Sequence, residues 1–227
     1  LDIRVHLVCK KANAAPTTLA LNIGLTGAGG LQVDTALKDP RLSKAMATVG
    51  SIYAKAGITI APVRVFKAAE IPFIAQQTGD KAEFTVLLRS GKLAKMGVNV
   101  MLVDKIVATG STGPGQALLA GLSGGIPGPP LEVGGDRSGI AVALHLGAGQ
   151  QDALGHTIAH ELGHFLGLFH TVEVPPLGGK SIKDNINDTD DTNTNLMHWS
   201  VGEEATELTS DQRFVLHGSP WLVPALD

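Results

Sequence analysis

The sequence predicts an α/β fold, because strand-like and helix-like segments alternate along its first part. Apolar side chains alternate with polar ones at 3–9, and largely apolar runs at 58–66 and 98–107 are typical of strands. Apolar residues recur every three or four positions from 42 to 56, and a shorter helix is expected at 84–91. This order favours parallel strand pairs joined by helices.

The middle of the chain interrupts this alternation. The stretch 108–135 holds nine Gly and four Pro, so it is either a flexible surface excursion or the rim of a cleft. A strand is expected at 138–146 and a helix at 152–169. Beyond residue 170 the sequence is irregular until Thr209 and Gln212, whose spacing predicts a capping box and a last helix.

These elements predict one catalytic domain, 1–227. Its larger N-terminal α/β lobe would span 1–167, and a small irregular lobe, 168–227, would follow.

Composition excludes several classes of protein. The 227 residues are 44% hydrophobic, which excludes a disordered chain, and the net charge of −3 gives no reason to expect nucleic-acid binding. The single cysteine, Cys9, excludes an internal disulfide framework and a cysteine-built zinc site, and its place in the first strand predicts a core residue. No run approaches the ~18 apolar residues that span a bilayer. The chain begins at Leu1 without a recognisable signal peptide, and we expect a monomer.

The segment HTIAHELGHFLGLFH carries the chemistry. His160 and His164 are four residues apart, so on a helix they lie on one face, one turn apart. Gly167 can adopt a positive φ that ends the helix and lets His170 turn back toward the same point. Three neutral imidazoles leave one position open on a tetrahedral metal, as in catalytic zinc sites. Glu161 could then serve as the general base for a bound water.

Other interpretations of this segment stay open. Histidines on an apolar helix are often buried, hydrogen-bonded core residues, although five residues fixed within eleven positions favour a metal site. His156, one turn before His160, would be either a fourth ligand or a histidine beside the site. A protein that keeps the fold but only binds, and a zinc hydrolase of a non-peptide substrate, are the alternative functions.

The motif from His160 to His170 resembles the long zinc-binding consensus of the metzincin metalloproteases. In these enzymes a methionine lies in a tight turn beneath the zinc, and Met197 in NLMHW fits that role. Within the clan the chain most resembles the pappalysin-like (M43-type) peptidases, through the Asp-Thr pairs at 188 and 191 and the LTSDQ start of the last helix.

The resemblance implies a mixed, twisted sheet with the active-site helix in the N-terminal lobe and a C-terminal lobe that ends in a helix. It implies a zinc-dependent endopeptidase that is secreted or displayed on the cell surface and acts on proteins or peptides. The strand at 138–146 would form the upper rim of the cleft, where an extended substrate could pair with it.

Two further features lie near Met197: the residues that follow it and the polar tract that precedes it. Related enzymes carry Tyr two residues after the methionine, where this chain has Trp199, which can donate a hydrogen bond but cannot ionise like a phenol. Trp199 or its neighbour His198 could contact the oxyanion or the substrate. The tract 184–195 is rich in oxygen ligands without EF-hand spacing, so it is either a calcium site or a solvated loop. Its candidate calcium ligands are Asp184, Asp188, Asp190 and Asp191.

Overall fold

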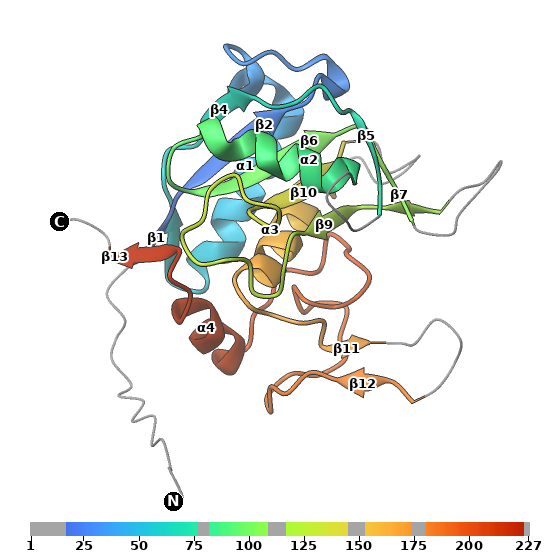
Figure 1. The fold of residues 1–227 in the computed structure, drawn as a ribbon. Coiled ribbons are helices and arrows are strands. Elements are labelled where there is room, and N and C mark those ends of the chain that lie inside the picture. Colours follow the sequence, from blue (N-terminus) through green and yellow to red (C-terminus); the bar gives the residue numbers. More distant parts are fainter. Residues whose placement is uncertain (1–16, 77–81, 109–116, 145–152, 174–179, 225–227) are drawn as a thin grey trace, which may run out of the picture.

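A five-stranded sheet forms the centre of the molecule in the computed structural model, which describes residues 17–76, 82–108, 117–144, 153–173 and 180–224. The strand order is β4-β2-β6-β10-β9 (Figure 1). The first four strands pair in parallel, and β9 adds an antiparallel edge. The strands are β2 (Leu21–Leu25), β4 (Arg64–Lys67), β6 (Val98–Val103), β9 (Gly121–Ser123) and β10 (Ile140–Ala143). The predicted mixed α/β fold is confirmed.

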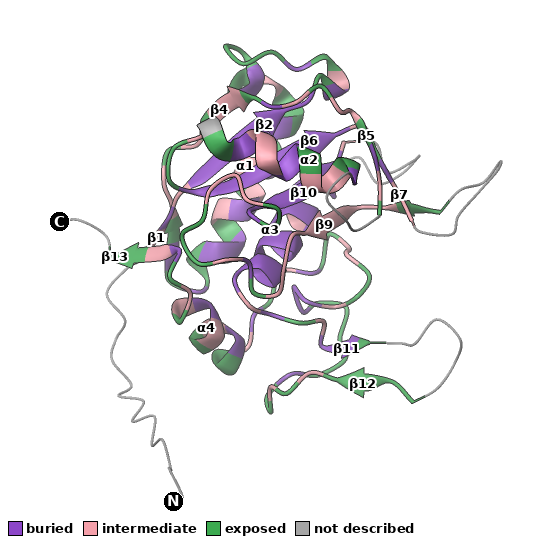
Figure 2. Cartoon of the chain, in the orientation of Figure 1, coloured by how far each residue is buried: buried purple, intermediate pink, exposed green. Residues whose placement is uncertain are grey.

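Helices cover both faces of this sheet. α1 (Pro40–Ala54) and α3 (Leu154–Phe165) share one core with the sheet, and α2 (Glu83–Ser90) belongs to a second core on the other side. The alternation within β6 shows the two faces: Val100 and Leu102 pack in the first core, and Met101 and Val103 pack in the second. Every residue of β6 is buried, as its apolar sequence predicts (Figure 2).

Smaller sheets surround the central one. The order β13-β1-β3 brings the last described strand beside the first. Its strands are β1 (Thr17–Leu19), β3 (Ile58–Ile60) and β13 (Leu222–Pro224). The sheet β5-β7-β8 contains β5 (Phe73–Ala75), β7 (Lys105–Val107) and β8 (Leu118–Leu119), and the pair β11-β12 contains β11 (Val172–Glu173) and β12 (Ile182–Lys183). Short 3₁₀ turns occur at η1 (Ala28–Gly30), η2 (Ala36–Lys38) and η3 (Gly91–Leu93).

The chain after α3 packs on the same core as α1 and α3. Leu168, Leu196 and Leu216 are fully or almost fully buried in it. The last helix, α4 (Ser210–His217), begins with the predicted capping box, in which Thr209 and Gln212 exchange hydrogen bonds of 3.0 and 3.1 Å. The division into two lobes stays a prediction.

Two predicted strands are each split in the structure. The segment 58–66 forms β3 and β4 in different sheets, because Pro62 lies between them and has no N–H for a strand ladder. The segment 98–107 forms β6 and β7 in different sheets, separated at Asp104, whose carboxylate accepts a hydrogen bond from the Gly29 N–H. In both cases continuous apolar sequence concealed a change of sheet.

The rim of the cleft also differs from the prediction. The strand predicted at 138–146 is β10, and it is an interior strand because β9 pairs with its outer side. The edge is β9, which belongs to the Gly-rich stretch 108–135, the other rim that the sequence allows. The predicted helix 152–169 is shorter, ending at Phe165. The predicted strand 3–9 and its Cys9 lie outside the described residues.

Candidate metal centre

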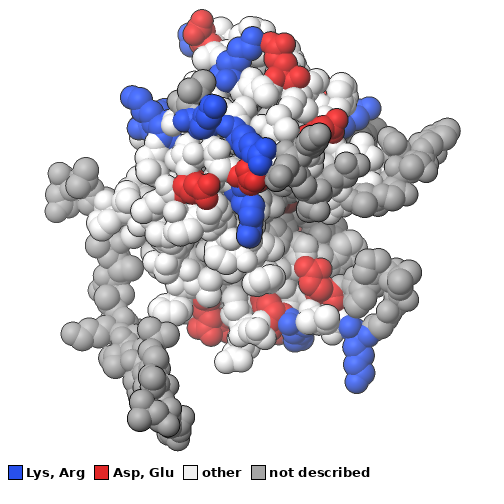
Figure 3. Space-filling view, viewed as in Figure 1, with Lys and Arg blue, Asp and Glu red and all other residues white. Residues whose placement is uncertain are grey.

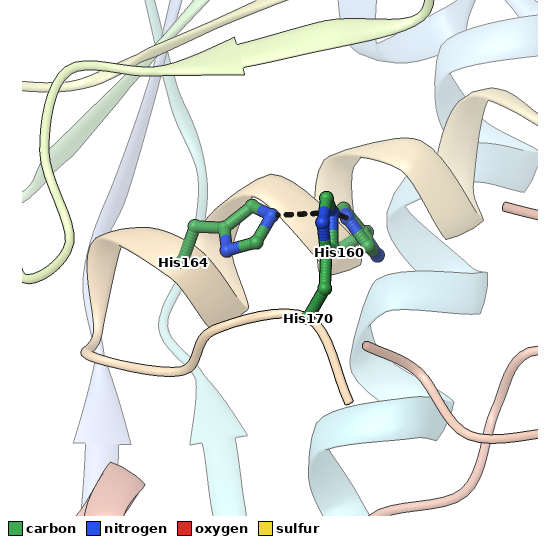
Figure 4. A group of neighbouring side chains, drawn as sticks. All are labelled: His160, His164 and His170. Carbon is green, nitrogen blue, oxygen red and sulfur yellow. Dashed lines mark hydrogen bonds between the residues drawn. The ribbon is translucent and has the colours of Figure 1, made fainter. Parts of the chain in front are cut away.

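Two imidazoles of the candidate site come from α3 and the third from the chain just after it. α3 ends at Phe165, and Gly167 adopts a φ of 117°, a backbone conformation that residues other than glycine rarely adopt. The chain then reverses and brings His170 beside His160 and His164 (Figure 4). The reversal has the form that the sequence predicts.

The three imidazoles converge on one point through their Nε2 atoms. The Nε2 atom of His170 lies 3.1 Å from that of His160 and 3.1 Å from that of His164. Nitrogen ligands at 2.0–2.1 Å from a tetrahedral zinc lie about 3.3 Å from each other. The observed spacing is therefore close to that of a zinc site. Among the described residues, this is the one group of three or more His, Cys, Asp or Glu side chains close enough together to hold a metal.

The opposite ring nitrogen of each histidine has an oxygen partner. The Nδ1–H groups of His160 and His164 donate to the carbonyls of Leu196 and Leu168, each at 2.7 Å. Nδ1 of His170 lies 2.6 Å from a carboxylate oxygen of Glu173. Because a carbonyl or carboxylate can only accept, Nδ1 carries the proton and Nε2 of a neutral ring keeps its lone pair. Three lone pairs that face one another fit a bound cation.

Burial keeps two of these rings neutral. It lowers the pKa of His160 to about 3 and that of His164 to about 4, with a further contribution from the neighbouring imidazoles. Neutral imidazole is the form that binds a metal. The protein environment thus favours ligation over protonation at these positions.

Glu161 is buried beside the histidines. Its side chain lies in a cavity of about 270 Å³ together with His160 and His170. Burial raises the pKa of the Glu161 carboxyl to about 8, and no hydrogen bond joins this carboxyl to another described residue. The edge strand passes very close, because a Cβ atom built on Gly121 would lie 2.4 Å from Cγ of Glu161.

The turn at Met197 packs against α3, the helix that carries His160 and His164. Met197 is fully buried, and a Cβ atom on Gly163 would lie 2.5 Å from its sulfur, so the thioether packs against α3 between the two helical histidines. Asn195 shapes the turn by accepting the Met197 N–H at 2.8 Å. Its amide also exchanges two hydrogen bonds with Gln212, at 3.0 and 3.1 Å.

Comparisons with known proteins agree with this geometry. A model of the peptidase M43 family, described as pregnancy-associated plasma protein-A, matches residues 144–215. Metalloproteinase-II of Bacteroides fragilis shares the fold with a TM-score of 0.50 at 17% identity, over 89% of this chain and 53% of that one. The chain thus spans about half the length of that protein. Archaemetzincin of Methanopyrus kandleri aligns with a TM-score of 0.45 at 16% identity, over 89% of this chain and 88% of that one. No curated protein matches the sequence.

Residues 144–215 are thus similar to an M43 peptidase, and the fold is similar to that of a metalloproteinase. This confirms the resemblance and the fold class expected from the motif. The family match covers the histidine segment, the turn at Met197 and most of α4, which are the parts that carried the resemblance. Taken with the histidine cluster, it supports a zinc metallopeptidase.

The other predicted site residues, Trp199, His198 and His156, differ in whether they face the cavity or the metal-binding group. Trp199 lines the cavity and is 56% exposed. His198 instead faces Asp191, with 3.6 Å between Nε2 and a carboxylate oxygen, and contacts the Ser200 carbonyl at 3.1 Å. His156 is not part of the metal-binding group, and its Nδ1 is buried without a partner.

The four aspartates predicted to bind calcium do not form a cluster in the structure. Among the described residues they form no group of three with Cys, His or other carboxylates. Asp188 accepts the Asp211 N–H at 3.0 Å at the start of α4, and Asp184 accepts from Thr189 at 2.6 Å within its own loop. Asp190 is exposed on the surface.

Sequence reasoning missed three contributors to the site. Glu173 supports His170, Gly121 borders Glu161, and Gln212 holds the amide that shapes the turn at Met197. Only Glu173 had a local signal, because it follows His170 by three residues. The other two come from segments far away in the sequence.

Proposed function

We propose that the chain is a zinc-dependent endopeptidase in which His160, His164 and His170 hold the metal and Glu161 is the general base. The observation that carries this proposal is the convergence of three Nε2 atoms on one point beside a cavity that the buried Glu161 side chain lines. That donor set leaves one position of a tetrahedral zinc open.

The residues divide the chemical work among themselves. Bound zinc would supply a Lewis acid that polarises the scissile carbonyl and lowers the pKa of a coordinated water to about 7. Glu161 would accept the proton of that water and pass it to the leaving amine. Its buried position strengthens it as a base, because desolvation favours the protonated form of the carboxyl. Met197, which packs against Gly163, would fix the position of the helix that carries His160 and His164.

An extended peptide fits the edge of the central sheet. β9 has no strand partner on its outer side among the described residues, and Gly121 of this strand lines the cavity. Main-chain pairing with such an edge would hold a substrate across the Glu161 carboxyl in an extended conformation. Trp199, which also lines the cavity, could donate its indole N–H to the substrate or the oxyanion.

The remaining expectations concern location and ions. No helix among the described residues is long and apolar enough to cross a membrane. Secretion or display on the cell surface, a monomeric state and calcium binding stay predictions. On the face drawn in Figure 3, the described residues carry both acidic and basic side chains.

A protein-substrate digest with four arms tests the proposal. The arms are the untreated chain, the chain treated with o-phenanthroline, Glu161→Gln, and the matched control Glu203→Gln on an exposed loop. We expect cleavage by the untreated chain and by the control only, with zinc bound in Glu161→Gln as well. Termini of the fragments would distinguish internal cleavage from trimming at chain ends.

The alternatives give different results. A catalytically silent binding protein would bind one zinc and leave every substrate intact. A zinc hydrolase of another substrate class would also leave proteins intact, but it would release product from an ester or amide panel and stop when o-phenanthroline is added. Equal cleavage in all four arms would reveal a contaminant and contradict the proposal.

A further inference from the structure

Thr157 lines the candidate catalytic cavity and carries a buried hydroxyl without a hydrogen-bond partner. The residue is fully buried, and its Oγ1 atom has no hydrogen-bond partner. It is one of the residues that line the cavity shared by Glu161 and His160. A buried hydroxyl without a partner destabilises a fold, so this position calls for an explanation.

The helix itself does not satisfy this hydroxyl. Threonine within a helix commonly donates its hydroxyl to the carbonyl one turn earlier. Here the Ala153 carbonyl accepts the Thr157 backbone N–H at 2.8 Å, and no bond from Oγ1 to this or any other acceptor is present. A valine would fill the same space without a polar atom, so packing alone does not require threonine.

The Glu161 carboxyl belongs to a residue one turn further along α3 that lines the same cavity. Residues four apart on a helix lie on one face with about 5–6 Å between their Cβ atoms, so Thr157 and Glu161 are neighbours. The carboxyl also has no hydrogen-bond partner among the described residues. Gly121 lies against the same side chain, because even a single added carbon there would overlap Cγ of Glu161. A donor and an acceptor, both unpartnered, therefore share one cavity wall.

We propose that Thr157 is a positioning residue for Glu161, whose carboxylate accepts a hydrogen bond from the Thr157 hydroxyl in the working enzyme. This inference rests on the proposed function, since it assigns a role relative to the general base. The bond would fix one carboxylate oxygen and leave the other directed at the reacting water. The fold would tolerate the unpaired hydroxyl because the gain appears during catalysis.

Two variants separate this role from a structural one. Thr157→Val keeps the shape of the side chain and removes the hydroxyl, whereas Thr157→Ser keeps the hydroxyl and removes a methyl group. For Thr157→Val we expect kcat to fall about tenfold with KM within about twofold of wild type. For Thr157→Ser we expect kcat within about twofold of wild type.

Melting of the metal-free chains supplies a readout independent of activity. Thr157→Val should melt at or up to about 4 °C above wild type, because it removes an unsatisfied buried group. Thr157→Ser should melt about 2–4 °C below wild type, because it leaves a small cavity. Thr157→Val would thus lose activity but not stability, and Thr157→Ser would lose stability but not activity.

Each contrary outcome identifies what failed. Wild-type kcat in Thr157→Val, or a kcat loss in Thr157→Ser equal to that in Thr157→Val, would overturn the positioning role alone. A clear drop in the melting temperature of metal-free Thr157→Val would show a structural hydrogen bond and also overturn it. If the wild-type chain cleaves nothing, the proposed function fails and this inference fails with it.

Discussion

Replacing Gly121 with alanine should impair catalysis without unfolding the protein. A Cβ atom at this position would lie 2.4 Å from Cγ of Glu161, 2.7 Å from Oε1 and 2.8 Å from Cδ. Carbon atoms in contact normally lie about 3.5–4.0 Å apart. Either the Glu161 side chain or β9 must therefore move by about 1 Å.

The size of the effect follows from that displacement. A catalytic group misplaced by about 1 Å costs on the order of a hundredfold in rate, which corresponds to about 2.7 kcal/mol of transition-state stabilisation. Stability should change much less, because the Glu161 carboxyl lines a cavity and has no hydrogen bond to lose. The backbone of Gly121 does not adopt a positive φ, so alanine adds no conformational strain there.

The assay is kcat/KM on a peptide that the wild-type chain cleaves, with zinc content and melting temperature measured on the same samples. Gly50→Ala in α1 is the matched control, because a Cβ atom there would meet nothing within 4 Å. The control should keep full activity and melt slightly higher, since alanine favours a helix over glycine by about 1 kcal/mol. Full activity in Gly121→Ala would refute the reasoning, and so would an activity loss explained entirely by lost zinc or unfolding.

Three further predictions concern the support of the metal centre. Gly163→Ala would place a carbon 2.5 Å from the Met197 sulfur and should lower the free energy of unfolding in urea by about 1–3 kcal/mol, and by less in a Met197→Ala background. Glu173→Ala removes the carboxylate 2.6 Å from Nδ1 of His170 and should weaken zinc binding about tenfold in a competition titration with a chelating dye. Removing the metal with a chelator should lower the melting temperature, and added zinc should restore it progressively with concentration, whereas an unchanged melting curve would contradict zinc binding by the folded state.

Secondary structure was predictable where the apolar pattern of a segment directly reflects which of its side chains are buried. α1 and the first part of the strand expected at 98–107 formed where the sequence predicts, because each buries a regular set of apolar side chains. The sequence did not reveal where one strand ends and the chain enters another sheet. The break at Asp104 depends on a hydrogen bond to Gly29, which is distant in the sequence. The edge strand β9 was also missed, because three residues in a Gly-rich stretch have no readable period.

Within the candidate site, the sequence predicted the metal-binding histidines, but it did not predict the contacts that position the catalytic side chains. His160, His164 and His170 follow a spacing imposed by helical geometry, so the structure brings them together as expected. The contact between Glu161 and Gly121 arises from packing of a helix against a sheet edge, and no local spacing encodes it. The aspartates of the predicted calcium site show the reverse case, in which composition suggested a cluster that the folded chain does not form among the described residues.

Close backbone approach explains why glycine is needed around this site. At Gly121 the edge strand comes close enough to confine Glu161, and at Gly163 the helix comes close enough to rest on Met197. Each approach is fixed by main-chain atoms, which move less than side chains, so one limits the movement of the Glu161 carboxyl and the other that of the Met197 side chain. A carboxylate confined by backbone on one side needs only one further contact to fix its orientation. The unpartnered Thr157 hydroxyl lines the same cavity, which is why we assign that contact to it.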